Sequence, residues 1–142
     1  MKRVTRGRGS VPVLPMLLVV MTWICGVASA SQAQGWGKNL YMQYCSACHG
    51  PGGKGDGVLS NLMHPKPPDL TQLAKKSGGT FPFYGVIRII DGRETVRAHG
   101  NSDMPVWGAR FQAEDSGSPD AQAIARGKVV LIADYLESIQ EK

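Results

Sequence analysis

Cysteine is scarce in this sequence, with three residues among 142: Cys25, Cys45 and Cys48. Cys25 lies in an N-terminal apolar segment that we expect to be removed. The other two are three positions apart, so an exported chain has no further cysteine with which to form a structural disulfide. Both remaining thiols are therefore available for one chemical purpose.

Histidine is equally scarce, and strand-like alternation is missing. A zinc site would need a second Cys/His pair at a spacing similar to that of Cys45 and Cys48, but His64 and His99 are single and far apart. A thioredoxin-like redox pair would need a preceding strand and a βαβ pattern, and the sequence has neither. With no strand alternation and no internal repeat, we expect an all-α fold.

An excess of charge is also missing once the N-terminus is set aside. The whole chain has 16 Lys and Arg against 11 Asp and Glu, a net charge of +5. Four of the basic residues stand in the first ten positions, and without them 12 basic and 11 acidic residues remain, a net of +1. The basic character belongs to the N-terminus, so it predicts no nucleic-acid partner.

The N-terminus has the layout of a secretory signal peptide over residues 1–30. The four basic residues precede an apolar run over residues 11–27, and the small residues at 28–30 form an A-x-A cleavage site. The alternative is an uncleaved membrane anchor, since residues 11–30 approach the length that spans a bilayer. Pro12 shortens the usable apolar stretch, so we expect cleavage and a periplasmic protein.

The motif that carries chemistry is Cys45-Ser46-Ala47-Cys48-His49. In C-x-x-C-H, two thiols on one helical turn add across the vinyl groups of a haem, and the adjacent histidine reaches the iron. A helix places residues i and i+3 on one face, and the next residue directs its imidazole over the porphyrin. The motif and the export signal together predict one covalently bound haem c, attached at Cys45 and Cys48, with His49 as an iron ligand.

The pattern along the chain predicts short helices separated by loops. Residues 31–36 are rich in Ser, Gln, Ala and Gly and predict a flexible tail, so the domain proper is expected at residues 37–142. An amphipathic stretch over residues 37–44 predicts a helix that runs into the haem motif. The glycine-rich residues 49–57 and the proline-rich residues 58–70 predict irregular chain.

Three later segments predict helices. Residues 70–76 follow Asp69, a candidate N-cap, and residues 81–90 carry apolar side chains at helical spacing. The third helix is expected at residues 121–140, with Ser118 as its cap and Pro119 in its first position. Its expected apolar stripe is Ile124, Leu131, Ile132, Tyr135, Leu136 and Ile139, interrupted at Lys128.

These features resemble the class I cytochromes c. Gly37-x-x-x-Tyr41 ahead of the C-x-x-C-H motif resembles their N-terminal helix, and residues 132–136 resemble their C-terminal helix. In that family the two helices cross tightly, with a glycine on the first and an aromatic residue on the last, here Gly37 and Tyr135. The resemblance covers residues 35–140 and implies a small single domain in which helices and loops enclose the haem.

The resemblance also implies a second axial ligand on the far side of the haem. Of the six methionines, three belong to the signal segment, and Met42 lies on the haem-attachment helix itself. Met63 and Met104 remain. Met104 precedes a proline in a loop that looks like the Met-Pro ligand loop of the family, so we expect Met104 as the ligand and Met63 in the core. His64 and His99 remain alternative ligands.

Other haem contacts follow from the same resemblance. In the family a proline carbonyl accepts a hydrogen bond from the proximal histidine, and Pro65, Pro67 and Pro68 compete for this role; we select Pro68. Trp107 either donates its indole N–H to a haem propionate or fills the core. Three arginines flank the ligand loop and are either propionate partners or solvated surface residues: Arg88, Arg93 and Arg97.

The implied function is single-electron transfer and not enzymatic catalysis. His/Met ligation leaves the iron no open position for a substrate. The expected partners are a donor dehydrogenase or bc-type complex and a terminal oxidase or reductase of a respiratory chain, with membrane contact only if residues 11–30 stay attached. One alternative is a haem subunit of an exported dehydrogenase or oxidoreductase. The other is a haem enzyme or sensor with an open distal site.

Overall fold

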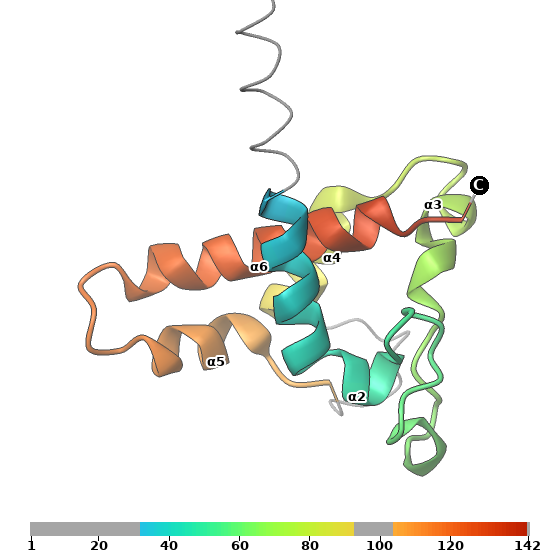
Figure 1. Ribbon diagram of the computed structural model, residues 1–142, viewed down its shortest axis with the longest axis horizontal. Coiled ribbons are helices and arrows are strands. Elements are labelled where there is room, and N and C mark those ends of the chain that lie inside the picture. The colour runs from blue at the N-terminus through green and yellow to red at the C-terminus, as the bar shows by residue number, and fades with distance from the viewer. Residues whose placement is uncertain (1–31, 93–103, 142) are drawn as a thin grey trace, which may run out of the picture. The chain divides into compact units, whose positions relative to one another are not determined.

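The computed structural model describes residues 32–92 and 104–141, and these contain helices and loops without a strand. Residues 32–44 form the first helix, which leads through Cys45 into the short helix α2, Ser46–His49 (Figure 1). The expected signal segment lies outside the described residues.

The middle of the domain consists of short elements linked by loops. Two 3-10 turns, η1 (Ser60–Leu62) and η2 (Leu70–Gln72), precede α3 (Leu73–Lys76) and α4 (Phe83–Asp91). The side chain of Asp69 accepts a hydrogen bond from the backbone N–H of Thr71, so the expected N-cap is confirmed.

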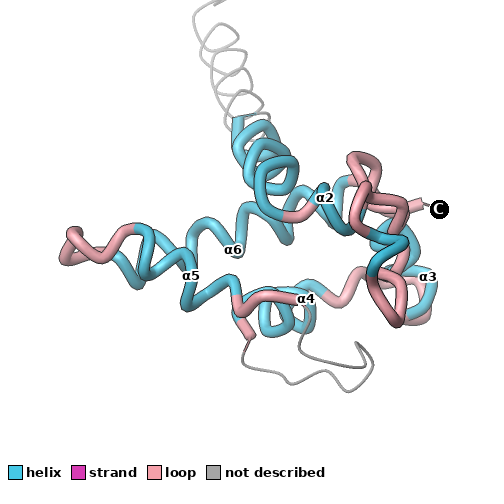
Figure 2. The backbone as a smooth tube through the Cα atoms, turned by 90° about the horizontal axis from the view of Figure 1, so that it is seen from below, coloured by secondary structure: helices cyan, strands magenta, loops and turns pink. Residues whose placement is uncertain are grey.

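Two further helices close the domain. They are α5, Trp107–Glu114, and α6, Ala121–Ser138. Helix α6 packs against both α5 and α4, and α5 lies alongside α6 in the two views of Figures 1 and 2. These contacts gather the apolar faces of all three helices around one core.

The first helix crosses α6 at Gly37. A Cβ atom on Gly37 would lie 2.1 Å from the carbonyl oxygen of Leu131 and 3.1 Å from the Cβ of Tyr135. Only glycine therefore allows this close backbone approach. One turn further along, the rings of Tyr41 and Tyr135 pack with centroids 5.2 Å apart. The expected Gly37–Tyr135 contact is confirmed.

The core lies between the first helix, α4, α5 and α6. Its most deeply buried side chains are Tyr41, Phe111, Val129 and Ile132, each below 2 % exposure. Burying such side chains contributes about 1.5–3 kcal/mol each in free energy of transfer from water. This core holds the haem motif and α4 in fixed relation to each other.

The expected cap and stripe of α6 need correction. The helix begins at Ala121 as expected and ends at Ser138, but its N-cap residue is Asp120, because residues 119 and 120 form a turn in which Ser118 Oγ accepts from the Asp120 N–H. Ile124 is 38 % exposed and is not part of the buried stripe, whereas Ala125 and Val129 are buried. The expected stripe left out both of these residues, which lie four positions apart on one face of the helix.

The structure also differs from the expectation at residues 31–36 and at the segment that follows Met104. Residues 32–36 are helical, so the first helix begins before Gly37. This stretch contains no proline, and the helix of residues 37–44 extends backwards through it. Helix α5 was not expected at all, although Trp107 and Phe111 stand four residues apart on one helical face.

No helix among residues 32–92 and 104–141 combines the length and apolar character needed to cross a membrane.

Candidate functional site

A cavity of about 400 Å³ opens beside the core and collects the residues that the sequence singled out. Its volume lies in the range typical of cofactor sites, and apolar side chains dominate its walls. The lining residues are Tyr41, Tyr44, Cys45, Cys48, His49, Met63, Pro65, Lys66, Pro67, Pro68, Leu70, Leu73, Lys76, Pro82, Gly85, Val86, Ile89, Ile90, Met104, Pro105, Trp107, Ile132 and Leu136.

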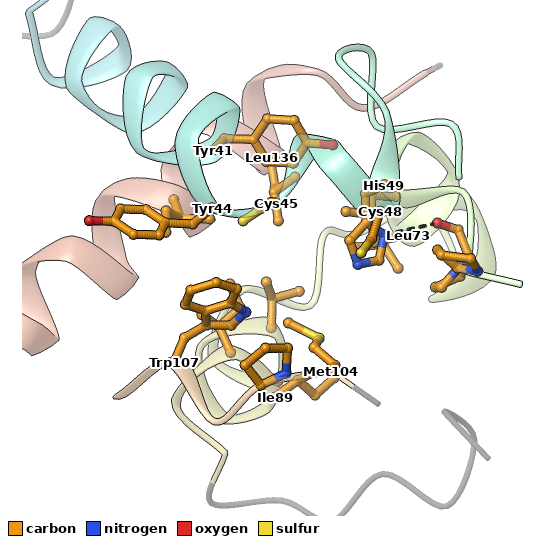
Figure 3. Close-up of a pocket in the computed structure, with 18 of the residues that line it drawn as sticks. Tyr41, Tyr44, Cys45, Cys48, His49, Leu73, Ile89, Met104, Trp107 and Leu136 are labelled. Atoms are coloured by element: carbon orange, nitrogen blue, oxygen red, sulfur yellow. Dashed lines mark hydrogen bonds between the residues drawn. The ribbon is translucent and has the colours of Figure 1, made fainter. Parts of the chain in front are cut away.

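The C-x-x-C-H segment forms one wall of this cavity (Figure 3). The backbone N–H groups of Cys48 and His49 both donate to the carbonyl oxygen of Cys45, at 3.2 and 2.9 Å. This helical turn brings both thiols and the imidazole to the same cavity. Cys45 and Cys48 are free thiols and are not joined by a disulfide.

The Cys45 thiol is the more deeply buried of the two. Burial, and to a smaller extent the neighbouring Cys48, raises the pKa of the Cys45 thiol to about 12. The uncharged thiol is therefore the stable form in this environment at neutral pH. An apolar wall around the sulfur suits a thioether, which carries no charge.

His49 is held from the side by the proline-rich loop. Its Nδ1 lies 3.4 Å from the carbonyl oxygen of Pro68, the longest hydrogen bond around the site, and the imidazole is 8 % exposed. With Nδ1 carrying the proton for this bond, Nε2 is the ring nitrogen whose lone pair can serve as a metal ligand. Of the three prolines considered, Pro68 is the one whose carbonyl makes this contact.

Met104 stands on the opposite wall from the C-x-x-C-H segment (Figure 3). Pro105 and Trp107 follow it along the same wall. Met63 also lines the cavity and is half-buried, so the expectation that Met63 belongs to the core is wrong. The sequence thus supplies two thioethers to one cavity.

The other histidines and the arginines do not join this site among the described residues. His64 is exposed and Arg88 is exposed, and neither lines the cavity. His99, Arg93 and Arg97 lie outside the described residues. The basic side chains that do line the cavity are Lys66 and Lys76, which the sequence analysis did not single out. Lys66 and Lys76 reach the cavity because the proline-rich loop and α3 fold back towards the haem motif, which the local sequence pattern does not predict.

Trp107 connects the cavity to the core. It is 8 % exposed, and its ring packs against Phe111 and against the edge of Tyr44, with centroids 5.6 and 5.4 Å apart. Its indole nitrogen lies on the edge of the ring that faces the cavity (Figure 3). Trp107 therefore fills the core with its ring while its N–H faces the cavity.

Leu73 and Ile89 complete the apolar walls: Leu73 lies beside Cys48 and His49, and Ile89 lies across the cavity near Met104 (Figure 3). The helical spacing of α4 could have placed Ile89 beside Val86 on one face, but not the loop packing of Leu73. Within residues 32–92 and 104–141, no three His, Cys, Asp or Glu side chains gather in a group able to hold a metal ion by themselves.

The donors on these walls fit a haem. Two neighbouring thiols can add to its vinyl groups, an imidazole can ligate its iron, and the apolar walls suit its porphyrin faces. Two lysines offer positive charge for its carboxylates. The site thus provides a partner for each chemical part of that cofactor.

A family model described as "Cytochrome C oxidase, cbb3-type, subunit III" matches residues 32–118. No curated protein and no solved structure matches the chain. The family match spans the first helix, the C-x-x-C-H motif, the methionine loop and α5. The chain therefore belongs to this family of c-type cytochrome domains, as a class I c-type cytochrome that binds haem c covalently and carries electrons.

Proposed function

We propose that the chain is a periplasmic monohaem electron carrier whose haem is attached at Cys45 and Cys48, with His49 and Met104 as axial iron ligands. One observation carries the proposal: segments far apart in the sequence bring these four side chains to a single apolar cavity. When bound, the haem supplies a one-electron Fe(III)/Fe(II) couple. The chain's own residues decide its potential and its access to solvent.

On the proximal wall, His49 would ligate the iron through an imidazole lone pair. The Pro68 carbonyl orients the imidazole and raises its basicity through the Nδ1–H bond. On the distal wall, the neutral thioether of Met104 favours the ferrous form. Pro105 restricts the backbone next to this ligand, so little chain movement is needed between the two oxidation states.

The apolar walls, like the Met104 thioether, raise the reduction potential of the haem. Leu73, Ile89 and Ile132 line the cavity and exclude water from it. Because a low-polarity environment disfavours the extra positive charge of the ferric form, these residues raise the potential. The weak net charge of the domain favours brief docking of partners around the haem edge, without strong electrostatic steering.

The proposed setting is the periplasm, with residues 1–30 acting as a cleaved signal and residues 37–142 as the cytochrome domain. Electrons would come from a dehydrogenase or a bc-type complex and pass to a terminal oxidase or reductase. These assignments are supported by the signal-like N-terminus and by the c-type attachment motif, because haem c is attached outside the cytoplasm.

The leading alternative is a fixed haem subunit of an exported oxidoreductase. Its support is the matched family, whose name refers to a subunit of an oxidase complex. Purification of the native protein under mild conditions distinguishes the two: a carrier elutes alone, whereas a subunit elutes together with a catalytic partner. A haem enzyme or sensor would instead require an open distal site and binding of carbon monoxide by the reduced protein.

Intact mass spectrometry of protein produced with the haem-attachment machinery tests the proposal as a whole. We expect the mass of a chain that begins at Ser31 plus one haem. Changing Cys45 and Cys48 to serine should abolish covalent attachment, whereas Cys25→Ser, the matched control, should leave the mature mass unchanged. Attachment that survives the double change, or a mature chain that keeps Cys25, would contradict the corresponding part of the proposal.

A further inference from the structure

We infer that the Tyr41 hydroxyl is a positioning group for the haem iron's proximal ligand, because it anchors the loop that brings the Pro68 carbonyl to His49. This inference rests on the proposed role of His49 as an iron ligand. Tyr41 lies on the first helix, and none of its surface is exposed to solvent.

The ring of Tyr41 and its hydroxyl have separate tasks. The ring packs against Tyr135 at a centroid distance of 5.2 Å, which a phenylalanine could reproduce. The hydroxyl donates a 2.6 Å hydrogen bond to the carbonyl oxygen of Gly50. Because a buried hydroxyl without a partner is costly, tyrosine at this position is explained by the bond to Gly50 and not by core packing.

Gly50 immediately follows His49 and terminates α2 with a positive φ of 81°. Its carbonyl oxygen also accepts from the N–H of Gly53 at 3.1 Å. Gly53 itself lies under the hydroxyl, since a Cβ on it would stand 3.6 Å from Tyr41 Oη. Tyr41 thus bonds to one end of the Gly50–Gly53 turn and lies close to its other end.

This turn is tied to the segment that supports the imidazole. The Gly53 carbonyl oxygen accepts from the N–H of Leu70 at 2.7 Å. Leu70 stands two residues after Pro68, whose carbonyl oxygen lies 3.4 Å from His49 Nδ1. The hydrogen bonds therefore lead from Tyr41 through Gly50, Gly53 and Leu70 back to the His49 side chain.

The last bond in this path, from His49 Nδ1 to the Pro68 carbonyl oxygen, is the one most sensitive to small displacements. At 3.4 Å it is longer than a typical N–H···O bond, so a displacement of Pro68 by a few tenths of an ångström weakens it further. A weaker Nδ1–H bond makes the imidazole a poorer donor to the iron, which disfavours the ferric form. Removal of the Tyr41 hydroxyl should therefore raise the midpoint potential.

The test uses the haem-loaded protein with Tyr41→Phe, and Tyr135→Phe serves as its matched control. Both changes remove one hydroxyl from the same pair of packed rings, but only Tyr41 reaches Gly50. Proton NMR of the reduced protein measures solvent exchange of the His49 Nδ1–H, and voltammetry measures the midpoint potential. For Tyr41→Phe we expect exchange about fivefold to tenfold faster and a higher potential, as the loss of one hydrogen bond predicts.

Two further variants probe the path from its other end. Gly53→Ala places a methyl group 3.0 Å from Ile139 Cδ1 and 3.6 Å from the Tyr41 hydroxyl, at positive φ, whereas Gly52→Ala meets only Lys54 Cγ at 3.9 Å. We expect Gly53→Ala, and not Gly52→Ala, to accelerate Nδ1–H exchange in the same way.

The inference is overturned if Tyr41→Phe only lowers the melting temperature, with Nδ1–H exchange and potential equal to those of Tyr135→Phe. A different result would overturn the proposed function instead. If the wild-type protein carries its haem but shows no histidine N–H signal of an iron-bound imidazole, His49 is not the ligand, whatever Tyr41 does.

Discussion

The Cα of Gly37 and the carbonyl of Leu131 approach so closely that a methyl group on Gly37 would stand 2.1 Å from the oxygen. That oxygen belongs to the backbone of α6, so it cannot swing aside as the end of a side chain can. The crossing of the first helix over α6 therefore depends on the missing side chain at Gly37. The same crossing places Tyr41 and the haem motif over the core.

We expect Gly37→Ala to lower the free energy of unfolding by about 1–3 kcal/mol, the usual cost of an overpacked core contact. Gly127→Ala is the matched control, because Gly127 also lies in a helix but has open space around it. It should be neutral or stabilising by about 0.5–1 kcal/mol, since alanine favours helix. Denaturant titration of both variants checks this, and equal effects would contradict the crossing.

Asp69 stabilises the turn that follows Pro68. Hydrogen bonds from the Thr71 hydroxyl, at 2.6 Å, and from the Thr71 backbone N–H, at 2.9 Å, hold the pKa of the Asp69 carboxyl below its usual value. The carboxylate is thus the form favoured by folding. Its contribution to stability is present above the unfolded-state pKa of about 4 and is lost as the pH falls through the lower folded-state pKa.

We therefore expect Asp69→Ala to cost about 1 kcal/mol at pH 7, and the difference from wild type to shrink below about pH 4. Asp120→Ala is the control, because Asp120 precedes α6 without a capping bond from its side chain. It should change the unfolding free energy by less than about 0.5 kcal/mol. Thermal unfolding across this pH range measures both, and a constant Asp69→Ala effect down to low pH would refute the assignment.

Lys76 lines the cavity, whereas its neighbour Lys75 does not. A positive charge beside the iron disfavours the ferric form, so Lys76→Gln should lower the midpoint potential, by about 10–40 mV for a partly screened charge. Lys75→Gln should produce a smaller shift. Both shifts should decrease at high ionic strength. Equal shifts for the two lysines would show that the cavity position of Lys76 has no influence on the iron.

The local pattern predicted most of the helices and all four of the proposed haem-binding side chains. The C-x-x-C-H motif places both cysteines and His49 on one helical turn. Gly37 and Tyr135 match the helix crossing of the class I cytochromes c. Asp69 caps a helical turn where expected. These features depend on contacts within a few residues or on a strong family pattern.

Features that depend on packing between distant segments were not predictable. Lys66, Lys76 and Met63 reach the cavity because the proline-rich loop and α3 fold back towards the haem motif. Helix α5 is short and mostly exposed, and packing against α6 stabilises it more than its own sequence does.

The most direct test of the account is the near-infrared absorption spectrum of the ferric protein, recorded for wild type, Met104→Ala and Met63→Ala. Both methionines line the cavity, so the second variant controls for the loss of a thioether that is not the proposed ligand. We expect the weak iron–thioether band in wild type and Met63→Ala and its loss in Met104→Ala, together with carbon monoxide binding by the reduced variant. A band that persists in Met104→Ala, or a wild-type protein that is high-spin and binds carbon monoxide freely, would contradict the proposed His49/Met104 carrier.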